Sequence, residues 1–182
     1  MFYLLRHALS VMLLPGTAVV LVPLWILRRY GVELTWPRTA GGIAIAAGGV
    51  LLLIPGVLLF AASLQRFFTS GRGTLAPWDP PARLVVTGPY RYVRNPMISG
   101  VIFMLFAIAL LLRSRPHAAW AGTFVLINMI YIPLLEEPGL AARFGADYDS
   151  YRKHVRRFVP RLTPWAGPAR ERSSLHEDRS RI

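Results

Sequence analysis

Residues 84–100 read LVVTGPYRYVRNPMISG and lead from a polar loop directly into an apolar segment. The loop contains turn-forming Gly-Pro and Asn-Pro dipeptides, at 88–89 and 95–96. The next charged residue beyond this loop is Arg113. A polar loop that feeds a membrane-length helix predicts half of a ligand site at the membrane surface. The acidic pair Glu136-Glu137 is expected to supply the other half.

The composition is that of a membrane protein. Of the 182 residues, 54% are hydrophobic and 16% charged, and the mean hydropathy is +0.42, which is too apolar for an ordinary soluble domain. Cysteine is absent from the sequence, which excludes disulfides, zinc thiolate sites and cysteine nucleophiles in this chain. The net charge is +12, but the basic residues stand between and after apolar runs. That placement favours anionic membrane lipids as the partner over nucleic acid.

Uncharged runs divide the chain into membrane segments. Such runs cover residues 8–27, 39–65, 96–112 and 118–135, and about 20 residues are needed to cross a bilayer. The pattern predicts an all-α membrane protein with four, possibly five, transmembrane helices. The third and fourth runs are short and closely joined, which indicates a helical hairpin.

The C-terminal part of the chain reads as a surface helix followed by a tail. Phe144, Tyr148, Tyr151 and Val155 recur at helical spacing within residues 141–158, which predicts an amphipathic helix that closes the ligand pocket. We divide the chain into an N-terminal helix pair (1–65), a core (66–162) and a flexible basic tail (163–182). The oligomeric state stays open.

The distribution of basic residues predicts an orientation. The loop 66–94 and the C-terminal part hold most of the arginines, so the positive-inside rule places them, with the N-terminus, on the cytoplasmic side. We expect an integral protein of a bacterial or archaeal inner membrane. The ends of the 96–135 hairpin must then be neighbours, which brings the loop to the acidic pair. Carboxylates, arginines and a tyrosine over an apolar floor suit a ligand that carries both charges and an aromatic base.

Two motifs in this region resemble a known family. GPYRYVRNPMISG resembles the GPYxxxRHPxYxG motif of the integral membrane methyltransferases, the group of isoprenylcysteine carboxyl methyltransferase and the phospholipid N-methyltransferases. The sequence from Glu136 to Arg161 is similar to the EExxL, FGxxYxxY and terminal VPR pattern of that group. The resemblance covers roughly residues 82–161.

The resemblance implies S-adenosylmethionine as the methyl donor, S-adenosylhomocysteine as its product, and a lipophilic small molecule or lipid as the acceptor. It implies that Glu136 holds the methionine amino group, and that Arg94 orients Glu137 or an anionic group of the substrate. Glu137 is the nearest candidate for a base. The donor contacts carried over are Leu84, Val85, Tyr90, Asn95, Pro96, Met97, Ile98 and Glu136.

Three positions depart from the family pattern. Asn95 replaces the usual histidine and Ile98 the usual tyrosine. Ile132 stands where isoprenylcysteine methyltransferases have an arginine for the substrate carboxylate. The sequence therefore predicts donor binding better than it predicts the acceptor, which is an isoprenylcysteine-like carboxylate, a phospholipid amine or another lipid.

Other interpretations of these residues stay open. Glu136-Glu137 also fits a helix leaving the bilayer, and Arg91 fits an interfacial anchor. A non-catalytic membrane protein that binds anionic lipid headgroups is the alternative of a different class. The four histidines are scattered and give no metal-binding spacing, so we expect no metal site.

Overall fold

Helices make up the fold in the computed structural model, which describes residues 12–70 and 84–167. No strand occurs within these described ranges. In chain order the elements are the π-helix η1 (Met12–Leu21), α2 (Val22–Arg29), α3 (Ala40–Ser70), the 3₁₀ turn η2 (Gly88–Arg91), α4 (Pro96–Leu111), α5 (Arg115–Tyr131), the π-helix η3 (Ile132–Glu136) and α6 (Glu137–His154).

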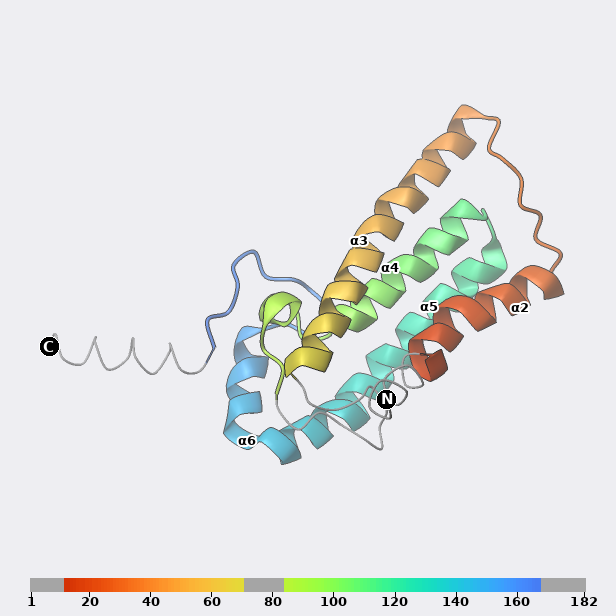
Figure 1. The fold of residues 1–182 in the computed structure, drawn as a ribbon. Helices are drawn as coiled ribbons and strands as arrows, with labels where there is room; N and C mark the ends of the chain where they lie inside the picture. The colour runs from red at the N-terminus through yellow and green to blue at the C-terminus, as the bar shows by residue number, and fades with distance from the viewer. Residues whose placement is uncertain (1–11, 71–83, 168–182) are drawn as a thin grey trace, which may run out of the picture.

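Helices α3 and α4 form the most extensive pair in the fold (Figure 1). They come together at two glycines. A Cβ atom added at Gly100 would lie 2.8 Å from the carbonyl oxygen of Gly56 and 2.9 Å from the backbone nitrogen of Phe60. Because no larger residue fits between the two backbones, these glycines set how closely the helices approach.

The core lies between α4 and α5. Val101, Met104 and Leu105 of α4 pack against Ala121 of α5, and all four are buried. Partly buried apolar side chains from η1, α3 and α5 surround this cluster: Val19, Leu53, Phe60, Trp120 and Phe124. The helical hairpin predicted from the third and fourth apolar runs is therefore present, with α3 against its first helix.

Within residues 12–70 and 84–167, two continuous helices are long and apolar enough to cross a membrane: Ala40–Arg66, and Arg115–His154, which runs through α5, η3 and α6. Helix α4 has 16 residues and spans about 24 Å at 1.5 Å per residue, less than the roughly 30 Å of hydrocarbon. The all-α membrane architecture agrees with the sequence. The count of four or five spans stays a prediction, and the first expected span, 8–27, lies partly outside the described residues.

The helix that starts at Arg115 changes direction at its C-terminal end. Pro133 has no N–H to continue the helical ladder, and the π-helix η3 forms around it. Farther on, Gly145 has φ 51° and ψ −128°, a conformation that favours glycine, and α6 bends there (Figure 1). The predicted amphipathic helix of residues 141–158 is thus the second part of a longer helix, and it ends at His154.

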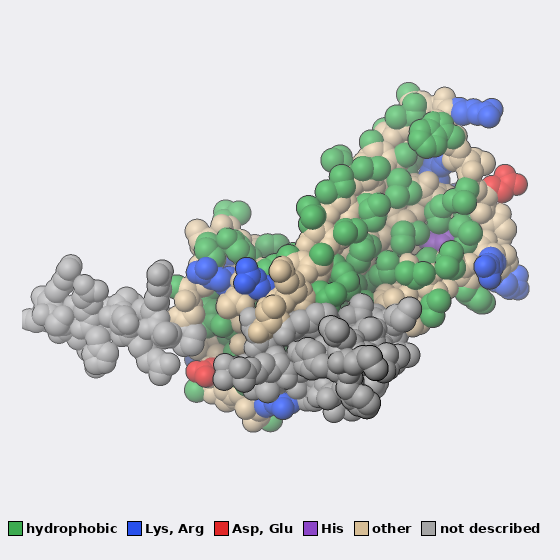
Figure 2. Space-filling model, in the orientation of Figure 1, with side chains coloured by type: hydrophobic (Ala, Val, Ile, Leu, Met, Phe, Trp, Pro, Cys, Tyr) green, Lys and Arg blue, Asp and Glu red, His purple; other side chains and the backbone are tan. Residues whose placement is uncertain are grey.

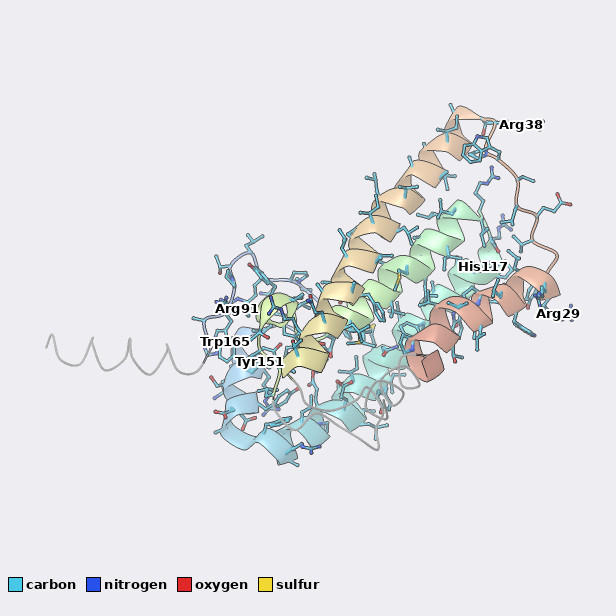
Figure 3. The ribbon with its side chains drawn as sticks, viewed as in Figure 1. Arg29, Arg38, Arg91, His117, Tyr151 and Trp165 are labelled. Carbon is cyan, nitrogen blue, oxygen red and sulfur yellow. The ribbon has the colours of Figure 1, made fainter. Side chains whose placement is uncertain are left out.

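The surface separates an apolar belt from two polar ends. Large side chains of α3 are exposed along its length, and green hydrophobic side chains cover this side of the molecule (Figure 2). One end of the helices carries Arg29, Arg38 and His117, and the other carries Arg91, Tyr151 and Trp165 (Figure 3). An apolar belt between two polar ends is the surface that a protein in a bilayer presents.

The close approach of α3 and α4 gives a testable consequence. Gly100→Ala places a methyl group against the backbone of α3 and should destabilise the fold by about 1–3 kcal/mol, the usual effect of overpacking. Gly122→Ala is the matched control, because nothing lies within 4 Å of its added Cβ and alanine favours helix by up to about 1 kcal/mol. Thermal unfolding in detergent should show a lower Tm for Gly100→Ala only. Equal Tm values for both variants would contradict the packing described.

Candidate functional site

The loop before α4 is shaped by a tight turn at Gly88. This glycine has φ 58°, and a Cβ atom there would lie 3.0 Å from Cγ of Arg66 on α3. The turn continues with hydrogen bonds from the backbone N–H of Tyr90 to the carbonyl of Thr87 (3.3 Å) and from Tyr92 to Pro89 (3.0 Å). As a result Tyr90 is buried, while Tyr92 is exposed.

Residues 155–167, which we call the C-terminal segment, double back along this loop. The backbone N–H groups of Arg94 and Asn95 donate to the carbonyls of Arg156 (2.9 Å) and Arg157 (3.3 Å). Farther along, the N–H groups of Arg161 and Trp165 donate to the carbonyls of Tyr92 and Arg91, both at 2.9 Å. Hydrogen bonds in both directions fix the position of the C-terminal segment over the loop.

Trp165 anchors the end of this segment. Its ring is buried, 5.4 Å from the ring of Tyr151 and stacked on His154 at 5.8 Å. Its carbonyl accepts a hydrogen bond from Nε of Arg91 (2.6 Å). The flexible tail expected from residue 163 therefore begins with packed residues, and the rest of it lies outside the described residues.

Glu137 lies at the centre of an ion network. Arg157 binds it with both ends of its guanidinium fork, Nε to Oε1 at 2.7 Å and Nη2 to Oε2 at 2.8 Å. Nη1 of Arg94 lies 3.0 Å from the same Oε1, and the side chains of Arg94 and Glu137 are each 11% exposed. The bidentate bonds raise the pKa of Arg157 above its ordinary value. Both carboxylate oxygens are therefore engaged by cations.

Two tyrosines of α6 support the loop from behind. The hydroxyl of Tyr151 donates to the carbonyl of Tyr90 (2.6 Å), and Nη1 of Arg94 donates to the hydroxyl of Tyr148 (3.2 Å). Tyr148 and Tyr151 are buried in one cluster with Val155 and Trp165. Burial first, and the negative charge of Glu136 second, raise the pKa of Tyr90 well above its ordinary value. Tyr90 therefore keeps its proton at neutral pH.

Glu136 differs sharply from its neighbour. It is half-buried, close enough to Tyr90 to affect the pKa of that phenol, and no residue of the described ranges forms a hydrogen bond or ion pair with it. Arg94 also has spare capacity, because its Nε is buried and without a partner among the described residues. A carboxylate without a cationic partner and a buried guanidinium N–H without an acceptor thus lie at the same end of the fold.

The remaining predicted donor contacts lie in the loop before α4 and in the first turn of α4. Pro96, Met97 and Ile98 form the first turn of α4, with Pro96 buried and the other two half-buried. Asn95 precedes them, and its carbonyl accepts from the N–H and the hydroxyl of Ser99 at 3.0 Å. Leu84 packs on the Tyr148 cluster, and Val85 beside it is buried. Their contact with a ligand stays a prediction.

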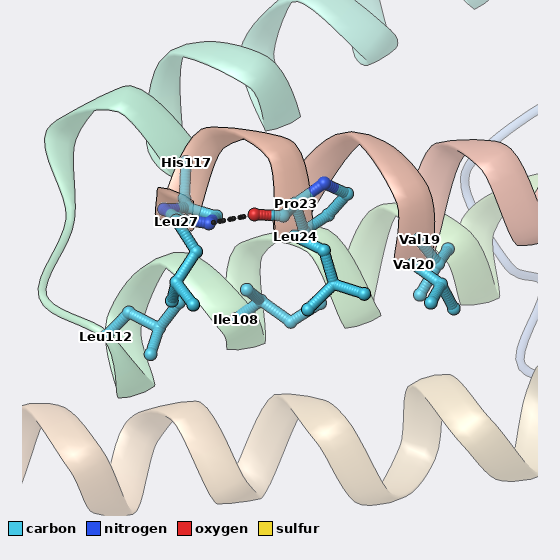
Figure 4. A pocket seen from close by; sticks show the side chains of 8 residues that line it. All are labelled: Val19, Val20, Pro23, Leu24, Leu27, Ile108, Leu112 and His117. Atoms are coloured by element: carbon cyan, nitrogen blue, oxygen red, sulfur yellow. Dashed lines mark hydrogen bonds between the residues drawn. The ribbon is translucent and has the colours of Figure 1, made fainter. Parts of the chain in front are cut away.

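Two cavities lie at the opposite end of the helices. One, of about 220 Å³, is bordered by α2, α4 and His117, whose Nε2 lies 3.1 Å from the carbonyl of Pro23 (Figure 4). The other, of about 180 Å³, is lined by Glu33, Trp36 and their neighbours. His117 and Glu136 are 19 residues apart along one helix, about 28 Å. These cavities are therefore separate from the centre at Glu136, and the closed pocket expected there stays a prediction.

Comparison with known proteins identifies one family. Residues 38–147 match the family described as phospholipid methyltransferase. The match covers more than half of the 182-residue chain and includes the loop, the hairpin and both glutamates. A search of curated proteins and a search of solved structures each found no match. The C-terminal segment lies beyond the matched residues.

The contact of Tyr151 with the loop can be tested directly. Tyr151→Phe leaves the carbonyl of Tyr90 without its donor, which should cost about 1–3 kcal/mol of stability. The control is Tyr131→Phe, because Tyr131 is 42% exposed. Thermal unfolding in detergent should separate the two variants, with a lower Tm for Tyr151→Phe. If both variants unfold at the wild-type temperature, the loop does not depend on this hydrogen bond.

Proposed function

The chain belongs to the phospholipid methyltransferase family, and from this premise we propose that it transfers a methyl group from S-adenosylmethionine to a lipid acceptor at the membrane surface. Family membership implies methyl transfer to a lipid-like substrate. The two long apolar helices support membrane association. The donor, the acceptor and the roles of individual residues are proposals, and each is argued below from the site.

Two groups with unused binding capacity, Glu136 and Arg94, support the choice of donor. Glu136 has no cationic partner in the described residues, and Arg94 has a buried Nε without an acceptor. The methionine part of S-adenosylmethionine carries an ammonium and a carboxylate, which complement these two groups. Hydrogen bonds between ionised groups are roughly twice as strong as neutral ones. Glu136 would bind the ammonium and Arg94 the carboxylate. The carboxylate of Glu136 without a cationic partner, together with the Nε–H of Arg94 without an acceptor, is the observation that carries the proposal.

The apolar wall of the site suits the rest of the donor. Leu84, Val85, Met97 and Ile98 are apolar and half-buried or buried beside the loop, where an adenosine can be enclosed. Tyr90 is protonated and supplies a neutral hydroxyl next to Glu136. Donor binding would cover this wall from water and strengthen the electrostatic contacts at Glu136 and Arg94.

The chemical step requires positioning above all. S-adenosylmethionine supplies an activated methyl group, and the acceptor atom bonds to the methyl carbon as the sulfur–carbon bond breaks. The ammonium of a phospholipid headgroup first loses its proton to water, and the neutral amine then needs no base in the transfer, because the positive charge passes from sulfur to nitrogen. Fixing two reactants in line contributes about 7–11 kcal/mol in favourable systems. The residues of this chain act by binding and orienting.

One observation favours a phospholipid amine over a prenylcysteine carboxylate. Ile132 is buried, 1% exposed, and carries no charge one helical turn before Glu136, so the start of η3 offers no cation there to a carboxylate. A carboxylate acceptor needs no base, but it lacks its cationic partner here. Glu137 is held by two arginines, so an amine acceptor would lose its proton to water before it reacts.

The location at the cytoplasmic face rests on the charge distribution. Arg66, Arg91, Arg94 and Arg157 gather at the end of the helices that holds Glu136. Basic residues near the ends of apolar helices favour the cytoplasmic side and attract anionic lipids. A lipid acceptor would reach the site laterally, from the bilayer.

The donor site predicts the effect of neutralising Glu136. Glu136→Gln removes the charge that pairs with the donor ammonium, and a hydrogen bond to a charged group contributes about 1.5–3 kcal/mol. S-adenosylhomocysteine should therefore bind about 10- to 150-fold more weakly, measured by calorimetry on detergent-purified protein. Glu33→Gln, at the opposite end of the fold, should bind as the wild type does. A folded wild-type protein that binds no S-adenosylhomocysteine would favour the non-catalytic, lipid-binding alternative.

A second experiment, independent of donor binding, tests which lipid accepts the methyl group. The protein is incubated with S-adenosylmethionine labelled on its methyl group in two parallel assays. One assay contains vesicles of phosphatidylethanolamine, and the other contains a prenylcysteine in detergent. Label should appear in the phospholipid fraction and not in the prenylcysteine ester, because no cation stands at residue 132. Incorporation into the prenylcysteine alone would contradict the choice of acceptor and leave the donor site unaffected.

A further inference from the structure

We propose that Arg157 is a positioning residue that assigns different tasks to the two adjacent glutamates, holding Glu137 as a structural anchor and leaving Glu136 free to bind the methyl donor. The proposal rests on the proposed function, and it concerns a residue outside the matched range 38–147. Arg157 does not contact the donor in this account. It acts through Glu137 and Arg94.

The geometry of Arg157 supports an anchoring role. Its Nε and Nη2 bind the two oxygens of Glu137 at 2.7 Å and 2.8 Å. This two-point contact between planar groups fixes the orientation of the carboxylate as well as its position. Arg157 is 33% exposed, whereas Glu137 is 11% exposed. The arginine therefore reaches in from the surface and covers the acid.

This contact determines how Arg94 is used. Nη1 of Arg94 lies 3.0 Å from Oε1 of Glu137, the oxygen that Nε of Arg157 also binds. Oε2 is already taken by Arg157. Arg94 is thus restricted to a single contact with Glu137, which leaves its buried Nε without a partner. Without Arg157, both oxygens of Glu137 would be open to Arg94.

Charge balance leads to the same conclusion. Glu137 is in contact with Arg94 and Arg157, and the charge of Arg152, which pairs with Asp149, also acts on it. Removing Arg157 takes away one of the two cations in contact with Glu137. Arg94 would then pair fully with Glu137, and the less shielded charge of Glu137 would favour protonation of Glu136, which removes the charge that binds the donor ammonium. Both changes weaken donor binding.

The C-terminal segment places Arg157 where it acts. The carbonyl of Arg157 accepts from the backbone N–H of Asn95 (3.3 Å), and that of Arg156 accepts from Arg94 (2.9 Å). The same residue therefore contacts the loop through its backbone and Glu137 through its side chain. Trp165 holds the far end of the segment. The segment thereby links the start of α4, the start of α6 and its own anchor.

Arg157→Gln tests the proposal, with Arg156→Gln as the matched control. Arg156 is the adjacent arginine, is exposed, and contacts the loop through its carbonyl, which the substitution keeps. Networks of this kind typically change a distant affinity by 0.5–2 kcal/mol, so S-adenosylhomocysteine should bind about 3- to 30-fold more weakly to Arg157→Gln. The KM for the donor should rise by a similar factor, and the KM for the lipid acceptor should not change. Arg156→Gln should match the wild type.

A charge-balanced double variant separates positioning from a general structural defect. Glu137→Gln/Arg157→Gln restores one acid and one arginine, so it should bind S-adenosylhomocysteine more tightly than Arg157→Gln alone. Arg157→Lys should fall between Arg157→Gln and the wild type, because lysine keeps the charge but not the fork. If Arg157→Gln does not fold, the affinities of the double variant and of Arg157→Lys for S-adenosylhomocysteine are each compared with that of the wild type.

Some results would overturn the inference. Wild-type affinity in Arg157→Gln would show that Glu137 needs no anchor. A double variant no better than Arg157→Gln would show that charge balance is not the mechanism. A folded wild-type protein that binds no S-adenosylhomocysteine would instead contradict the proposed function itself, so the two failures are distinguishable.

Discussion

Glu137 connects three parts of the chain that are far apart in sequence. It begins α6, it receives Arg94 from the loop before α4, and it receives Arg157 from the C-terminal segment. Charges that are largely removed from water are stable only when they are paired with good geometry, and here three charged side chains meet that requirement together. This contact ties the loop to the start of α6 and to the C-terminal segment, next to Glu136.

The contrast between the two glutamates follows from their surroundings. Glu137 has cations on both oxygens, while Glu136 points to a region with Tyr90 and no partner of opposite charge in the described residues. Neighbouring groups of the same type can serve different roles when their environments differ. In this fold the bend of the helix around η3, followed by α6, turns the two side chains toward different neighbours. Under the proposed function, a structural acid and a ligand-binding acid occupy consecutive positions.

The sequence predicted the topology that brings the site together, because two apolar runs with a short joint leave few alternatives. The proximity of Arg94 to Glu137 follows from that hairpin. Two features were missed. Arg157 and Trp165 lie in a stretch without helical or strand periodicity, and their contacts depend on chain reversal over the loop, which no local pattern specifies. The sequence named Glu137 as the nearest candidate for a catalytic base, and that role stays a prediction. In the structure both of its carboxylate oxygens are engaged by two arginines.

The central claim is that the methyl donor binds between the loop and the end of α5. Hydrogen exchange of the detergent-purified protein, with and without saturating S-adenosylhomocysteine, tests this most directly because it locates the ligand along the chain. The account predicts slower exchange in residues 84–98 and 132–140, and no change in α2, which borders the separate apolar cavity. Protection confined to α2, or unchanged exchange in both segments despite binding, would contradict it.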